Sequence, residues 1–337
     1  MTRARKHLIC LDETPYYHVT SRCVRRAFLC GIDRQTGKSY EHRRAWIEDR
    51  IRVLSSLFSI ELCAYAIMSN HYHLVVRINP DEPASWSDDE VLRRWTALFR
   101  GPILVQRYLA GDPLATVELD TVRTVATLYR ARLGSLSWFM KCLNEPIARK
   151  ANAEDSCSGH FWEARFHSQP LRSEDALVAA MAYVDLNPVR ANIAGKPQDS
   201  DYTSIKARLA GDSQRTVQRS ASTLLESGEI NHFQVPPRPL MPFSDNGRAD
   251  DTGIVTLPVQ ALEYVRLVEA SGRLRVHGKR GRIDPALESV LTRLGFSADE
   301  WLSASTAFAL HYRRGELQHT RVARHTGQTS DQTWILR

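Results

Sequence analysis

Two runs of β-forming residues decide the fold: Ile60-Glu-Leu-Cys-Ala-Tyr-Ala-Ile67 and His71-Tyr-His-Leu-Val-Val-Arg-Ile78. Only Met68-Ser-Asn70 lies between them, and so short a link is typical of an antiparallel hairpin. A third run, Tyr16-Tyr-His-Val-Thr-Ser21, follows Pro15 and is expected to join the same sheet.

Helices are expected around this hairpin. Helical spacing of apolar residues, or a capping serine followed by acidic residues, predicts helices over 44–58, 87–99, 136–152 and 173–187. Pro146 is expected to kink or split the third of them. Because the strands adjoin through a hairpin and not through a crossover, the pattern favours an α+β fold with helices packed on an antiparallel sheet.

Domain boundaries are expected where the periodic pattern of apolar residues weakens. Residues 1–210 are expected to form one domain, in which 101–131 are hard to place. Residues 211–253 carry a weak pattern and the run Pro236-Pro-Arg-Pro239, and we interpret them as a linker. Residues 254–337, with a basic loop over 272–282, are expected to form a small helical C-terminal domain that contacts DNA.

Composition narrows the class of protein. The 337 residues are 43% hydrophobic and contain no run of about 18 apolar residues, which excludes wholesale disorder and predicts no membrane span. Six cysteines without a C-x-x-C pair indicate reduced thiols and a cytoplasmic location. The 45 Lys and Arg against 38 Asp and Glu give a charge of +7, which favours a polyanionic partner, nucleic acid before membrane.

Two stretches carry residues with chemistry. His71 and His73 lie two apart on a strand, so their side chains share one face and are able to share one divalent ion. Tyr183 lies on the helix after Ser173, and Asn187 is one turn further on the same face. Taken singly, such histidines are more often surface or packed residues, and such a tyrosine more often marks the edge of a core.

Four motifs in order resemble a known family, the single-tyrosine HUH transposases of the IS200-like group, in the branch associated with repetitive extragenic palindromes (REP). The motifs are Tyr17-His-Val-Thr-Ser-Arg22, Tyr65-Ala-Ile-Met-Ser-Asn-His-Tyr-His-Leu-Val-Val76, Gly159-His-Phe-Trp-Glu-Ala-Arg-Phe166 and Tyr183-Val-Asp-Leu-Asn-Pro-Val-Arg190. They cover roughly residues 10–210. Residues 263–280 also resemble the extension of the longer members, whereas Cys23 and Pro146 depart from the family pattern.

The resemblance implies a ferredoxin-like fold and a reaction. His71, His73 and Asn187 would hold Mg²⁺ or Mn²⁺, and Tyr183 would attack a DNA phosphate to give a 5′-phosphotyrosine and a free 3′-OH. The substrate would be single-stranded or hairpin DNA, bound by a monomer or a homodimer. Side chains able to contact this DNA are Arg22, Arg25, Arg26, Trp162, Arg165, Arg190, Arg273, Lys279 and Arg280.

Two other functions remain open at this stage. One is a transposase that has lost catalysis and only grips palindromic hairpins. The other is a metal-dependent phosphohydrolase that uses water as the nucleophile and leaves Tyr183 without a chemical role.

Overall fold

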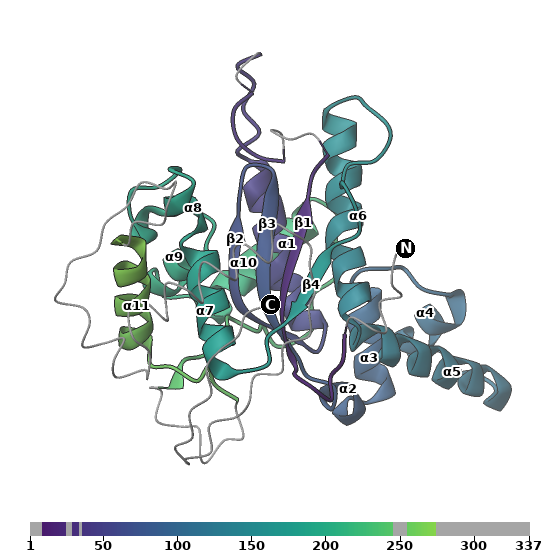
Figure 1. The fold of residues 1–337 in the computed structure, drawn as a ribbon. Coiled ribbons are helices and arrows are strands. Elements are labelled where there is room, and N and C mark those ends of the chain that lie inside the picture. Colours follow the sequence, from purple (N-terminus) through teal and green to yellow (C-terminus); the bar gives the residue numbers. More distant parts are fainter. Residues whose placement is uncertain (1–8, 25–28, 34–35, 245–254, 274–337) are drawn as a thin grey trace, which may run out of the picture.

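The computed structural model describes residues 9–24, 29–33, 36–244 and 255–273, which form an α+β fold around one antiparallel sheet (Figure 1). The four strands lie in the order β2-β3-β1-β4. They are β1 (Tyr16–Arg22), β2 (Ile60–Ile67), β3 (His71–Ile78) and β4 (His167–Pro170). The predicted hairpin and its pairing with the first strand are confirmed.

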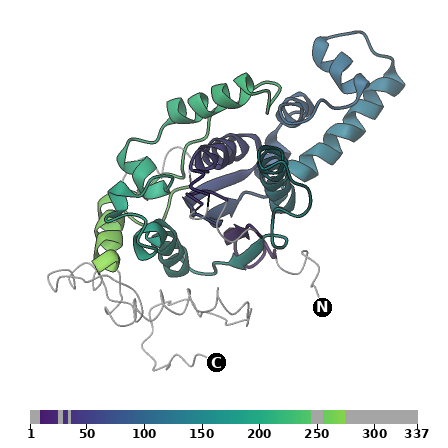
Figure 2. The same cartoon turned by 90° about the horizontal axis from the view of Figure 1, so that it is seen from above.

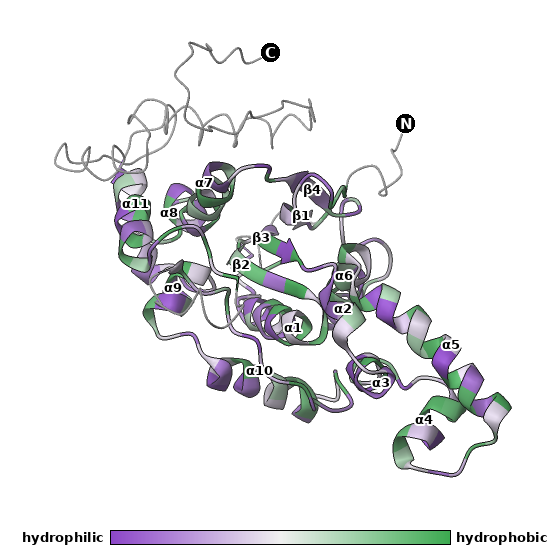
Figure 3. Ribbon diagram, turned by 90° about the horizontal axis from the view of Figure 1, so that it is seen from below, coloured by the Kyte–Doolittle hydropathy of each residue, from purple (hydrophilic) through white to green (hydrophobic). Residues whose placement is uncertain are grey.

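One face of the sheet packs on two long helices. These helices are α1 (Arg43–Leu57) and α6 (Leu136–Glu154), and their apolar side chains share a core with Tyr17, Val19 and Leu74. Helix α6 runs unbroken through Pro146, so the expected split there is wrong. The opposite face is covered by α7 (Glu174–Asp185), and the view in Figure 3 separates the two layers clearly.

Residues 82–133 add four helices at one edge of the molecule. They are α2 (Glu82–Ser85), α3 (Asp88–Thr96), α4 (Ile103–Ala110) and α5 (Thr116–Leu133). The outer ones, α4 and part of α5, project from the body (Figure 2). The Ser87 hydroxyl accepts a hydrogen bond from the Glu90 amide, as its capping position predicted. None of the described helices is both long and apolar enough to cross a membrane.

The helix that carries Tyr183 ends where the sequence indicates. Ser173 caps α7 by accepting a hydrogen bond from the Ala176 amide. After Leu186 the chain begins a second short helix, α8 (Asn187–Arg190), with Pro188 in its first turn. Proline needs no amide partner there, so it is compatible with the first turn of α8.

The segment predicted to be a linker is in fact folded. After the short turn Pro197–Asp199 come α9 (Ser204–Leu209) and α10 (Gln214–Glu226), and α10 packs on the outer side of α1 (Figure 3). Val217, Ala221 and Leu224 are buried there at helical spacing. The linker prediction is therefore wrong for 211–244, because apolar side chains of this segment are buried in the same core as those of α1.

The start of the expected C-terminal domain is also part of this body. Helix α11 (Ala261–Arg273) packs against α7, and its Tyr264 hydroxyl donates a 2.6 Å hydrogen bond to Asp185. Residues 255–273 do not form a separate unit, because Leu267 and Val268 share a core with α7. The remainder of the predicted domain, 274–337, lies outside the described residues.

Replacing Tyr264 by phenylalanine is expected to lower the free energy of unfolding by about 1–3 kcal/mol. Asp185 is fully buried and also accepts hydrogen bonds from Ser204 and from the Ile205 amide. Losing the phenol leaves a buried carboxylate with one donor fewer. Urea denaturation measures the change, with Tyr108→Phe as the control, since no hydrogen bond of that hydroxyl is seen in the described part of the chain. An equal effect of the two variants would contradict the docking of α11 on α7.

Candidate active site

The face of the sheet below α7 carries the polar residues of the candidate site. In the antiparallel pairing of β1 with β3, Arg22 lies opposite His71 and Thr20 lies opposite His73. Side chains alternate along a strand, so every second residue of each strand projects towards α7. Val75 on this face packs with α7, which identifies the helix that covers it.

His71 and His73 lie side by side, as predicted from their spacing. Their ring centroids are 4.7 Å apart and the ring planes are 82° apart. His73 is fully buried, whereas His71 is partly exposed. The Nδ1 of His71 lies 2.5 Å from the amide oxygen of Asn70. An amide oxygen only accepts, so Nδ1 donates here and Nε2 is the nitrogen of His71 with a lone pair.

His18 on β1 joins the pair and was missed in the sequence. Its Nε2 lies 3.0 Å from Nδ1 of His73, and both side chains are buried. The sequence did carry a signal for His18, because strand periodicity places His18, Thr20 and Arg22 on one face, as it does His71 and His73.

Tyr183 reaches the histidines from α7. Its ring meets those of His73 and His18 edge-on, at centroid distances of 5.7 Å and 6.2 Å. The side chain is 7% exposed. Three elements of one chain, β1, β3 and α7, thus bring together the two predicted histidines, His18 and the predicted tyrosine.

Asn187 and Arg190 follow Tyr183 on the next helix, α8, which a single residue separates from α7. The Asn187 side-chain nitrogen is buried and makes no hydrogen bond within the described residues. The Arg190 guanidinium carbon lies 5.7 Å from the centre of the Tyr183 ring. Burial lowers the pKa of Arg190, and no carboxylate in the described part of the chain forms an ion pair with it.

The charge state of the histidines suits a metal ligand. Burial, with the repulsion of neighbouring charges, lowers the pKa of His18 to about 3 and that of His71 to about 4, and it lowers the pKa of His73 well below its usual value. All three imidazoles are therefore neutral at pH 7, the form in which histidine binds a metal.

A metal site at this cluster would need a ligand other than His, Cys, Asp or Glu beside the two predicted histidines. Among the described residues, no three side chains of those four types are grouped to hold a metal. Asn187 as a third ligand, with a phosphate oxygen of the substrate as a further one, stays a prediction. The buried atom of Asn187 that lacks a partner in the described residues is its amide nitrogen, a donor, whereas the amide oxygen would be the atom to bind an ion.

The comparisons with known proteins add one similarity. No family model matches the chain, and no curated protein matches its sequence. The chain is similar to a solved REP-associated tyrosine transposase bound to a REP hairpin, with a TM-score of 0.34 and 11% identity, over 63% of this chain and 87% of that one. A similarity this low does not establish a shared function or shared site residues.

The residues predicted to contact DNA differ in their placement. Arg22 is exposed beside the histidines, and its positive charge helps to lower the pKa of His71. Arg165 and Arg273 are exposed as well. Trp162 is partly buried: its ring packs on Tyr72 and its N–H donates to a backbone carbonyl, so packing already accounts for much of this side chain. Four residues lie outside the described residues: Arg25, Arg26, Lys279 and Arg280.

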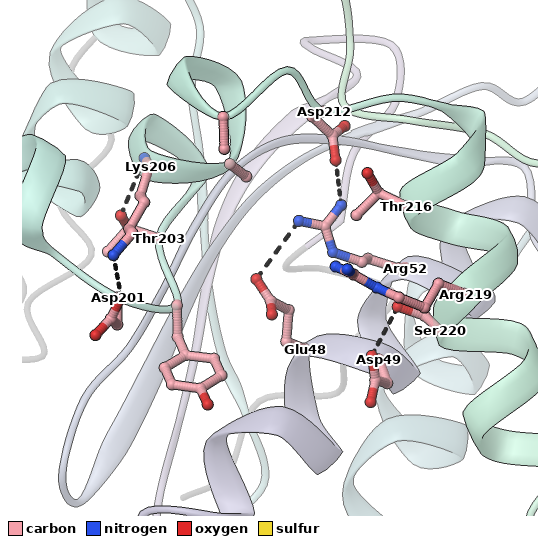
Figure 4. A pocket seen from close by; sticks show the side chains of 13 residues that line it. Glu48, Asp49, Arg52, Asp201, Thr203, Lys206, Asp212, Thr216, Arg219 and Ser220 are labelled. Atoms are coloured by element: carbon pink, nitrogen blue, oxygen red, sulfur yellow. Dashed lines mark hydrogen bonds and ion pairs between the residues drawn. The ribbon is translucent and has the colours of Figure 1, made fainter.

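A cavity of about 540 Å³ lies apart from this cluster, between α1, α9 and α10 (Figure 4). Its charged groups largely compensate one another. Arg52 pairs with Asp212 and Glu48, and Lys206 pairs with Asp201. None of the predicted site residues lines it, so the cavity does not compete with the histidine cluster as the candidate site.

The neutral histidines predict that acid destabilises the metal-free protein. The unfolded chain takes up protons below about pH 6.5, whereas folded His18 and His71 do so only near pH 3 and pH 4. Their contribution to the free energy of unfolding is fully present above pH 6.5. As the pH falls below that value, it decreases by about 1.4 kcal/mol per pH unit for each histidine. Urea denaturation with a chelator, between pH 7 and pH 5, measures the slope. It should be shallower for His71→Gln, and an unchanged slope would contradict the burial of this histidine in neutral form.

Proposed function

We propose that this protein cleaves and rejoins single-stranded DNA through a covalent bond to Tyr183. The observation that supports it best is the position of the Tyr183 ring next to His73, with 5.7 Å between the ring centroids, and His71 lies beside His73. A hydroxyl nucleophile, neutral imidazoles and two arginines without carboxylate partners in the described residues are the groups that attack on a phosphodiester requires.

In the proposed reaction the Tyr183 oxygen attacks the phosphorus, and the bond from phosphorus to the 3′ oxygen breaks. The phenolic proton is lost and the leaving oxygen gains one, so the products are a 5′-phosphotyrosine and a 3′-OH. Attack by another 3′-OH reverses the step and joins strands without ATP, since the number of phosphoester bonds is unchanged. Mg²⁺ or Mn²⁺, held by His71, His73 and Asn187, would polarise the scissile phosphate and neutralise developing charge.

The arginines have separate roles in this proposal. Arg190 lies against the Tyr183 ring, where a positive charge stabilises the phenolate that attacks and later leaves. Arg22 is exposed and lies opposite His71 on the neighbouring strand β1, where it can bind a phosphate next to the one attacked. A single strand suits this arrangement because the nucleophile must reach one backbone, and hairpins from extragenic palindromes are the proposed source.

The test is incubation of the protein with labelled hairpin and single-stranded oligonucleotides in Mn²⁺ or Mg²⁺. The expected products are a fragment ending in 3′-OH and a protein–DNA band that resists denaturation, both absent when EDTA is added. Cleavage to a free 5′-phosphate without the covalent band would favour the hydrolase. Tight hairpin binding without cleavage in either metal would favour a protein that only binds.

A further inference from the structure

The hydrogen bond between His18 and His73 has a consequence for how His73 binds a ligand. The two ring nitrogens are 3.0 Å apart and the rings are tilted by only 12°, with centroids 5.1 Å apart. This is the geometry of an in-plane hydrogen bond. Two ring nitrogens at this distance share one proton, so one ring donates and the other accepts.

The direction of this hydrogen bond decides which nitrogen of His73 has a lone pair. If Nδ1 of His73 donates to His18, then Nε2 of a neutral His73 carries no proton and can bind a cation. If His18 donates instead, Nε2 of His73 carries the proton and cannot. A ligating histidine commonly has its second ring nitrogen fixed by a neighbouring acceptor in this way.

We propose that Nε2 of His18 accepts from Nδ1 of His73 and holds that ring as the tautomer able to bind the divalent ion. His18 is then a positioning residue that acts through His73. The inference rests on the proposed function, in which His73 is a ligand.

The neighbouring histidine supports this direction independently. His71 donates from its own Nδ1 to the Asn70 amide oxygen, which leaves Nε2 as its ligand atom. With His18 as the acceptor, the two adjacent histidines adopt the same tautomer and present the same atom. Two different acceptors, the Asn70 amide oxygen on the turn and the His18 imidazole on β1, would then each hold a histidine with its Nε2 unprotonated.

The tautomer can be measured on the wild-type protein without metal. Long-range ¹H–¹⁵N correlation spectra of histidine-labelled protein distinguish a protonated Nδ1 from a protonated Nε2, and His73→Gln identifies the signals. The expected result is a protonated Nδ1 and an unprotonated Nε2 for His73. A protonated Nε2 would overturn the proposal whether or not the protein cleaves DNA.

Substitution of His18 tests the consequence for metal binding. In His18→Gln the side-chain oxygen takes the place of Nε2 and can still accept, whereas His18→Phe keeps the ring and removes the acceptor. We expect Phe to weaken Mn²⁺ binding about 10–100-fold and Gln to restore most of it. Isothermal titration calorimetry without DNA gives the affinity, and urea denaturation checks folding. His42→Phe, an exposed histidine on the opposite side of the sheet, is the control.

The possible results distinguish a failure of the role of His18 from a failure of the metal site. Equal Mn²⁺ affinity in wild type, His18→Phe and His18→Gln, together with weaker binding by His71→Ala, would refute the role of His18 alone. Wild-type protein that binds no Mn²⁺, or binds it as well after His71→Ala, would refute the metal site of the proposed function.

Discussion

Replacing Tyr183 by phenylalanine is expected to reduce DNA cleavage at least about 10³-fold and to eliminate the covalent protein–DNA band. The change removes one oxygen from a ring that is 7% exposed and keeps the edge-on packing on His73 and His18. Hairpin affinity should stay close to that of the wild type, because phosphate contacts elsewhere supply most of it. Gel-shift and cleavage assays on the same samples measure both quantities.

Tyr16→Phe is the matched control for this variant. Tyr16 is a half-buried tyrosine that packs on the same core as α7 but is not among the residues of the histidine cluster. It should cleave at the wild-type rate. Full cleavage by Tyr183→Phe would mean that water or another hydroxyl is the nucleophile, and the hydrolase would then replace the transferase.

His71→Ala is expected to reduce metal-dependent cleavage about 10³-fold, since a lost ligand removes several kcal/mol of charge stabilisation in the transition state. We choose His71 and not His73 because His71 is partly exposed, so its removal leaves a smaller cavity in the core. Binding of hairpin DNA should remain largely intact. Cleavage rates over a range of Mn²⁺ concentrations measure the effect.

The control for this variant is His42→Ala, which removes an exposed imidazole just before α1, on the face of the sheet away from the histidine cluster. It should leave cleavage and its dependence on Mn²⁺ unchanged. Wild-type rates for His71→Ala, or loss of cleavage together with unfolding, would remove the support for His71 as a ligand.

Much of the fold could be predicted from local patterns. The hairpin over 60–78 was predicted to the residue, because alternation of side chains and a three-residue link leave few alternatives. Strand β4 was missed, since four residues that include Pro170 carry no alternation. Helix α10 was missed although Val217, Ala221 and Leu224 have helical spacing, because serine, threonine and glutamine between them weaken the pattern.

The packing of α11 was beyond such patterns. Asp185 is fully buried and Tyr264 is 79 residues away, and neither residue type signals burial in the sequence. For the same reason, the prediction of a separate C-terminal unit failed at residues 255–273. The stretch before α11 was interpreted as a linker because it contains prolines and few apolar residues. The sequence does not show that those apolar residues pack against other elements of the fold.

The candidate site was predictable where its residues share an element. His71 and His73 were paired by the periodicity of a strand, and their rings lie side by side. Asn187 was paired with Tyr183 by helical periodicity but lies on the following helix, α8, so that pairing stays a prediction. That the strand and the helix meet was expected only from the resemblance in their motifs. His18 was overlooked because a single histidine on a strand has no second one beside it to draw attention.

The most direct test of the central claim is to identify the residue that becomes bonded to DNA. The denaturation-resistant complex would be digested with nuclease and protease, and the modified peptide sequenced by mass spectrometry. The proposed function predicts a nucleotide joined through its 5′-phosphate to Tyr183, in a sample prepared with Mn²⁺. A nucleotide on any other residue, or cleaved DNA with no modified peptide, would contradict it.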